Sequence, residues 1–144
     1  MKHCFMIGHR DAPETIYSEL CSVIEQHITL YGVTEFMVGE HGTFDRMALR
    51  AVVQLKKSYP HVKLTLLLAY LCAKQKEKKA GVDELFYPPG METVPRRYAI
   101  ARANRYAADW CDCMIAYAWH PASNARNVAE YVQHRAPVTW ISKV

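Results

Sequence analysis

The sequence lacks any long hydrophobic segment. The leucine-rich apolar run at residues 66–71, for example, is much shorter than the roughly 20 residues that a membrane-spanning helix needs. The apolar part of residues 1–8 is also too short for a signal peptide, and it predicts a strand that starts almost at once. We therefore expect a cytoplasmic protein that does not contact a membrane.

The sequence also lacks a regular set of cysteines. Its five cysteines form an odd number without repeating spacing, and several fall in apolar stretches. This pattern favours free, buried thiols in a reducing compartment over disulfides. Cys111 and Cys113 could form half of a zinc site, but no second pair of Cys or His residues stands nearby at ligand spacing. We expect no metal and no other cofactor.

A strong excess of one charge is absent as well. The formal net charge is +4, and the lysines concentrate in residues 74–79. Such a short run is usually a solvated surface, so nucleic acid is not the expected partner. The length of 144 residues suits one domain with a core, and a hydrophobic content of 51% leaves apolar surface to cover. We expect a homo-oligomer, with a dimer as the first guess.

Strand-like and helical patterns alternate along the chain. The predicted strands lie at residues 4–7, 36–38, 62–70, 113–119 and 138–141. Helical spacing of apolar residues between them predicts a Rossmann-like three-layer α/β/α sandwich with a mainly parallel sheet of about five strands. One domain would span residues 1–144. Residues 71–93 break the pattern, and we expect them to form a flap that acts as a lid, with a short extended piece at residues 85–87.

The chain is organised around the stretch from Phe36 to Ala48, which reads as a strand, a glycine turn and a helix start. Gly39 and Gly42 allow positive φ and close approach of a ligand to the backbone. Thr43 is a candidate N-cap, and Asp45 in the first turn suits the helix dipole. The free N–H groups of this turn predict a phosphate or another anion, although any strand-to-helix turn in an α/β protein needs a glycine.

Polar residues gather where the predicted strands end, and ligands bind at these ends in open parallel sheets. The candidate ligand-binding residues after the first two strands are Gly8, His9, Arg10, Gly39, Glu40, His41, Gly42, Thr43, Asp45 and Arg46. Those after a later strand are His120, Ser123 and Asn124, joined by Arg102, Asn104 and Arg105 from the preceding helix. Arginine binds two phosphate oxygens at once, but surface ion pairs for the arginines and structural roles for the histidines are the alternatives.

The same motifs resemble a known family. Gly8-His9-Arg10, the stretch from Gly39 to Arg46, and Arg102-Ala103-Asn104-Arg105 are similar to short bacterial or phage members of the SLOG superfamily, which joins the LONELY GUY enzymes to DprA-type proteins. The resemblance runs over nearly the full length. It implies a Rossmann-like fold that binds nucleotides or nucleotide-derived ligands, often as a sensor. LONELY GUY enzymes use a Pro-Gly-Gly-x-Gly-Thr-x-x-Glu turn, whereas residues 121–130 here lack those glycines.

Three functional hypotheses follow, in this order. The first is binding or sensing of a nucleotide-like small molecule at the strand ends. The second is a nucleoside-monophosphate phosphoribohydrolase that cleaves the N-glycosidic bond, with Arg102 polarising the phosphoribosyl group and Glu40 or Asp45 supporting the ribose cation. The third, from the DprA side of the resemblance, is a DNA-binding accessory protein, which the mild charge disfavours.

Overall fold

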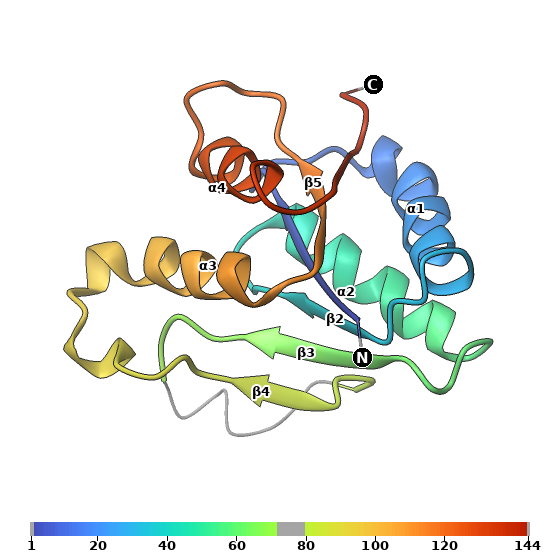
Figure 1. The fold of residues 1–144 in the computed structure, drawn as a ribbon, viewed down its shortest axis with the longest axis horizontal. Helices are drawn as coiled ribbons and strands as arrows, with labels where there is room; N and C mark the ends of the chain where they lie inside the picture. The colour runs from blue at the N-terminus through green and yellow to red at the C-terminus, as the bar shows by residue number, and fades with distance from the viewer. Residues whose placement is uncertain (1, 72–79, 144) are drawn as a thin grey trace.

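The computed structural model describes residues 2–71 and 80–143. Parallel strands alternate with helices and form one sheet between two helical layers (Figure 1). The strands are β1 (His3–Gly8), β2 (Glu35–Val38), β3 (Lys63–Leu67), β4 (Glu84–Phe86), β5 (Cys113–Tyr117) and β6 (Val138–Trp140). The helices are α1 (Tyr17–Thr29), α2 (Thr43–Lys56), α3 (Ala99–Trp110) and α4 (Asn124–Gln133), with short 3-10 turns at Glu14–Ile16, Met91–Thr93 and Arg96–Tyr98.

The strand order places β1 in the interior of the sheet, next to the point where the order of the strands reverses. The order is β4-β3-β2-β1-β5-β6, and all neighbours are parallel. From β1 the chain builds the sheet outward through β2, β3 and β4, and then returns to the other side of β1 for β5 and β6. The strand order therefore reverses between β1 and β5, and this switch point is where open α/β sheets form a crevice.

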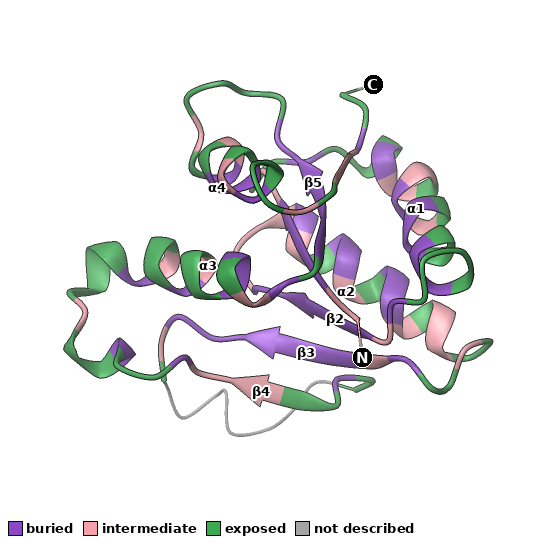
Figure 2. Cartoon of the chain, in the orientation of Figure 1, coloured by how far each residue is buried: buried purple, intermediate pink, exposed green. Residues whose placement is uncertain are grey.

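Alternate residues of β1 explain why the strand reads as an unbroken apolar run. Cys4 and Met6 pack with α1 and α2 on one face, while Phe5 and Ile7 pack with α3 and α4 on the other. Each of these four residues is at most 5% exposed. Figure 2 shows the same burial along the strands and on the helix faces turned toward them. A strand covered on both faces needs no polar alternation.

The predicted architecture is confirmed, and the sheet has six strands in the described part of the chain instead of about five. The additional strand is β4, which pairs in parallel with β3 through Thr65–Glu84, Leu66–Leu85 and Leu67–Phe86. It corresponds to the extended piece expected at residues 85–87. This part of the expected flap is thus an edge of the sheet. The rest of the expected flap includes residues 72–79, with the whole lysine run, and these lie outside the described residues.

Two details of the predicted elements were wrong. The strands expected at residues 62–70 and 113–119 end earlier, at Leu67 and Tyr117. Gly42, not Thr43, is the N-cap of α2, and Thr43 is the first helical residue. No helix in the described part of the chain combines the length and apolar character needed to cross a membrane.

Candidate functional site

A pocket of about 410 Å³ opens at the carboxyl ends of β1 and β5. We call it the switch-point pocket. Four segments line it: the end of β1 with the loop after it, the turn after β2, one face of α3, and the loop that follows β5. Its polar and aromatic lining consists of Phe5, His9, Arg10, Asp11, His41, Asp45, Asn104, Trp119, His120, Ser123 and Asn124. The fold therefore brings together residues that lie more than a hundred positions apart in the sequence.

The loop after β1 is clamped to the start of α2. The carbonyl of Arg10 accepts hydrogen bonds from both the backbone N–H and the hydroxyl of Thr43, each at 2.8 Å. Gly42 has φ +118°, and a Cβ there would lie 2.5 Å from the Arg10 Cα. A Cβ on Gly8 would lie 2.2 Å from the Phe44 ring. These two glycines are therefore required by close packing between segments, and the Thr43 N–H already has a partner inside the protein.

Asp45 and His41 form the wall of the pocket on the β2 side. The backbone N–H of His41 donates to Oδ2 of Asp45 at 2.9 Å. Burial raises the pKa of the Asp45 carboxyl to about 7, although this hydrogen bond and the charges of Arg10 and Arg46 act in the opposite direction. Asp45 can therefore hold or release a proton near neutral pH.

The His41 ring presents a buried nitrogen without a partner. Nε2 of His41 has no hydrogen-bond partner among residues 2–71 and 80–143. Burial, aided by the charge of Arg10, lowers the pKa of this histidine, so its ring is neutral at physiological pH. Buried polar atoms in native proteins are nearly always paired, and one that is not calls for an explanation such as a binding role.

The loop after β5 is held by a chain of hydrogen bonds that starts from His9, the residue after β1. The His120 N–H donates to Nε2 of His9 at 3.1 Å, so the proton of the neutral His9 ring lies on Nδ1. Burial lowers the pKa of His9 and favours that neutral form. The Ala122 N–H donates to Nδ1 of His120 at 3.2 Å. Both histidines thus shape the loop, in addition to lining the pocket.

Ser123 ends this loop and is the N-cap of α4. Its hydroxyl accepts from the Arg126 N–H at 3.1 Å and donates to the His120 carbonyl at 2.9 Å. The first residues of α4, Asn124 and Ala125, line the pocket beside it. The positive end of the α4 dipole therefore faces the switch-point pocket.

Trp119 is a pocket residue that the sequence reasoning missed. It lies two positions after the end of β5, and its side chain is 41% exposed. The Lys143 ammonium lies 4.1 Å from the ring centroid, and the His9 ring meets it edge-on at 5.4 Å. Its position between the end of a strand and His120 was the signal that could have identified it.

Six of the residues predicted to bind the ligand lie outside the lining of the pocket. They are Glu40, Gly42, Thr43, Arg46, Arg102 and Arg105. On α3, Ile100 and Asn104 face the pocket because they are four positions apart on one face. Arg102 and Arg105 are exposed on other faces of the helix, and the Arg105 guanidinium stacks on Tyr131 at 3.6 Å. No residue of 80–93 lines the pocket either, so the described part of the expected lid does not cover it.

Comparison with solved structures finds a crystal structure of DNA processing protein A (DprA) from Streptococcus pneumoniae, with a TM-score of 0.72 over 97% of this chain. The chain has a DprA-like fold. The sequence identity is 16%, and this chain corresponds to 50% of the length of the DprA chain. The Rossmann-like fold that the SLOG resemblance implied is therefore confirmed. No protein-family model and no curated protein sequence matches this chain.

Proposed function

We propose that the switch-point pocket binds a nucleotide or a nucleotide-derived small molecule. One observation carries this proposal. A helix N-terminus, an arginine and an exposed tryptophan line the same cavity at the topological switch point. The first two suit a phosphate and the third suits a base. The volume of about 410 Å³ is within the range of small-molecule sites.

The phosphate would lie at the N-terminus of α4. Ser123, Asn124 and Ala125 line the pocket there, and α4 has ten residues, so its dipole favours an anion. Arg10 reaches the same cavity from the loop after β1. This placement differs from the turn after β2 that the glycines suggested. In that turn the N–H groups of His41 and Thr43 already bond to Asp45 and Arg10.

The base and sugar would occupy the part of the pocket between Trp119 and the β2 turn. The Trp119 ring offers a stacking surface, and the unpaired Nε2 of His41 offers one hydrogen-bonding atom. Asn104 on α3 adds an amide that can both donate and accept. These groups account for recognition of a ligand larger than inorganic phosphate.

Two experiments test the proposal. Native mass spectrometry of gently purified protein would detect a bound ligand. A thermal-shift assay would then compare adenosine monophosphate, adenosine diphosphate and ADP-ribose. We expect at least one compound to raise the melting temperature in a saturable way, because a ligand at a hundredfold excess over its dissociation constant adds about 2.7 kcal/mol to the free energy of unfolding. Arg10→Ala should reduce the shift. Arg97→Ala is the matched control, since Arg97 is exposed outside the pocket and stacks on Tyr98. No shift from any compound at millimolar concentration would contradict the proposal.

A second candidate function, N-glycosidic hydrolysis of a nucleoside monophosphate, is favoured by Asp45. A carboxyl group with a pKa of about 7 in a ligand-sized pocket is suited to general acid catalysis. Asp45 would protonate the departing base as its bond to C1′ breaks, and water would then add to C1′ and return a proton to the carboxylate. Release of free base from a panel of monophosphates, abolished in Asp45→Asn, would support this function. Binding without base release would leave the sensor function.

A further inference from the structure

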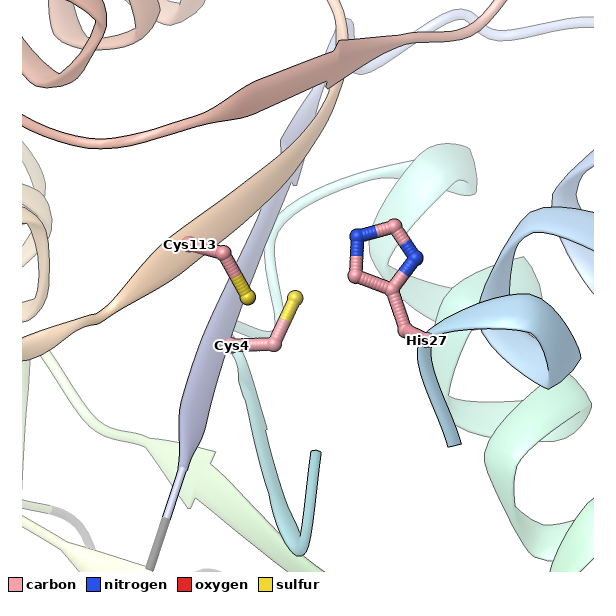
Figure 3. A group of neighbouring side chains, drawn as sticks. All are labelled: Cys4, His27 and Cys113. Atoms are coloured by element: carbon pink, nitrogen blue, oxygen red, sulfur yellow. The ribbon is translucent and has the colours of Figure 1, made fainter. Parts of the chain in front are cut away.

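Three metal-binding side chains converge at the end of the sheet opposite the switch-point pocket. Cys4 near the start of β1 and Cys113 at the start of β5 are direct cross-strand neighbours, and His27 reaches them from the last turn of α1. Their ligating atoms all lie within 4.8 Å of one another. All three residues are at most 3% exposed. Figure 3 shows the two sulfurs close together, with the His27 ring turned toward them.

The His27 ring is fixed in the form that binds a metal ion. Its Nδ1 lies 2.7 Å from the Val23 carbonyl, which can only accept, so Nδ1 carries the ring proton. The lone pair is then on Nε2, the nitrogen that faces the sulfurs in Figure 3. A histidine that donates its other ring N–H to a carbonyl is the usual arrangement in protein metal sites.

We propose that Cys4, His27 and Cys113 form a zinc site. On binding, the two thiol protons leave to solvent, and two thiolates balance the charge of Zn²⁺ beside a neutral imidazole. This neutrality suits a buried position, where an uncompensated charge is costly. Thiolate and imidazole are also the ligands that zinc takes in proteins.

The geometry needs only a small adjustment. Zinc–sulfur bonds of about 2.3 Å and zinc–nitrogen bonds of about 2.0 Å place tetrahedral ligands about 3.6–3.8 Å apart. The present separations of up to 4.8 Å close by about 1 Å through side-chain rotation. Among the described residues three ligands are supplied, so a solvent-derived ligand would complete the coordination.

The proposed site would stabilise the fold without joining the chemistry of the pocket. Gly8, at the carboxyl end of β1, lies four positions after Cys4, which corresponds to about 13 Å at the rise of an extended strand. A bound ion would link α1 to the two strands on either side of the switch point. Zinc and a nucleotide-like ligand should therefore bind independently, so failure of one proposal leaves the other testable.

The test uses the full chain, reduced and freed of metal with a chelator. Titration with Co²⁺, a spectroscopic substitute for Zn²⁺, should produce visible d–d bands and a sulfur-to-cobalt charge-transfer band that saturate at one equivalent. Zn²⁺ should then displace Co²⁺ and raise the melting temperature, and native mass spectrometry should show one bound zinc. Absence of these bands in the wild-type protein would overturn the proposal without any variant.

Variants locate the site. Cys113→Ala and His27→Gln should each lose the cobalt bands. Cys111→Ala, the control, should keep them, because Cys111 is equally buried but its thiol bonds to the Ala108 carbonyl and packs on the other face of the sheet. Zinc retained at one equivalent in Cys113→Ala would overturn the proposal. A disulfide would overturn it as well. The purified protein would then be lighter by two hydrogens than the reduced protein, and Cys113→Ala would show no such mass difference. That result would indicate a Cys4–Cys113 disulfide in place of a zinc site.

Discussion

The backbone N–H of His41 donates to the carboxylate of Asp45 at 2.9 Å, across the turn that joins β2 to α2. The same turn holds Gly42 at φ +118° against the Arg10 backbone. Asp45 is therefore kept in place by the turn while its half-buried side chain lines the wall of the switch-point pocket. Its ionisation and the rigidity of the turn lead to separate predictions.

Asp45 should make stability depend on pH. Because its pKa is raised from 3.8 to about 7, the folded protein holds this proton more tightly than the unfolded chain. The contribution of this proton to the free energy of unfolding is full below about pH 4 and is lost as the pH rises through about 7. The shift in pKa corresponds to a total contribution on the order of 4 kcal/mol. Asp45→Asn should remove this dependence while keeping an acceptor for the His41 N–H.

Urea unfolding at pH 5 and pH 8 measures the effect. Relative to the wild type, Asp45→Asn should gain stability between pH 5 and pH 8, whereas Glu92→Gln, an exposed carboxylate outside the switch-point pocket, should show no such gain. A difference between Asp45→Asn and the wild type that stays constant across this range would show that the carboxyl group titrates normally.

Gly42→Ala should destabilise the protein strongly. A Cβ at this position would lie 2.5 Å from the Arg10 Cα, and the backbone adopts a positive φ of 118°. We expect a loss of about 3 kcal/mol or more, since strain and a backbone clash add together. Gly32→Ala is the control, because Gly32 also has positive φ but nothing lies within 4 Å of its added Cβ. It should lose only about 1 kcal/mol; equal losses in thermal unfolding would refute the role of the clamp.

Ser123→Ala should weaken both stability and ligand binding. Removal of the hydroxyl frees the Arg126 N–H at the start of α4, and loss of an N-cap costs about 1 kcal/mol. The frayed helix end would then offer a poorer phosphate site. Ser22→Ala, at an exposed position within α1, should leave the binding constant unchanged in calorimetry. Unaltered nucleotide affinity in Ser123→Ala would argue against the phosphate position proposed at α4.

Trp119→Ala should separate recognition of the base from recognition of the phosphate. Stacking of a base on an aromatic ring is worth about 1–3 kcal/mol, so affinity for adenosine monophosphate should fall roughly tenfold or more. Affinity for ribose 5-phosphate, which has no base, should hardly change. Tyr98→Ala, at an exposed position in the 3-10 turn before α3 and outside the pocket lining, serves as the control. Equal losses for both ligands would mean that Trp119 supports the pocket but does not stack on the base.

The fold could be predicted from the sequence because its signals are local. The unbroken apolar run of β1 and the helical spacing after it reflect burial on both faces of a parallel sheet. The strand β4 was harder, since it has three residues at the sheet edge and only partial burial. The position of Thr43 was wrong because the cap depends on the backbone angle of Gly42, which packing against Arg10 imposes.

The candidate site could be predicted only in part. The residues at strand ends, such as His9 and His120, follow from topology alone. Which face of α3 meets the pocket depends on helix rotation, so Asn104 lies in the lining while Arg102 and Arg105 do not. The Cys4, His27 and Cys113 cluster left no spacing signal, because its members come from three elements that only the fold brings together.

Backbone amide NMR of the labelled protein during titration with adenosine monophosphate would show whether the switch-point pocket binds a nucleotide. We expect saturable chemical-shift changes centred on residues 8–10 and 119–125, the two segments on either side of the switch point. Shifts confined to the outer face of α3 around Arg102, or no shifts at millimolar nucleotide, would contradict it.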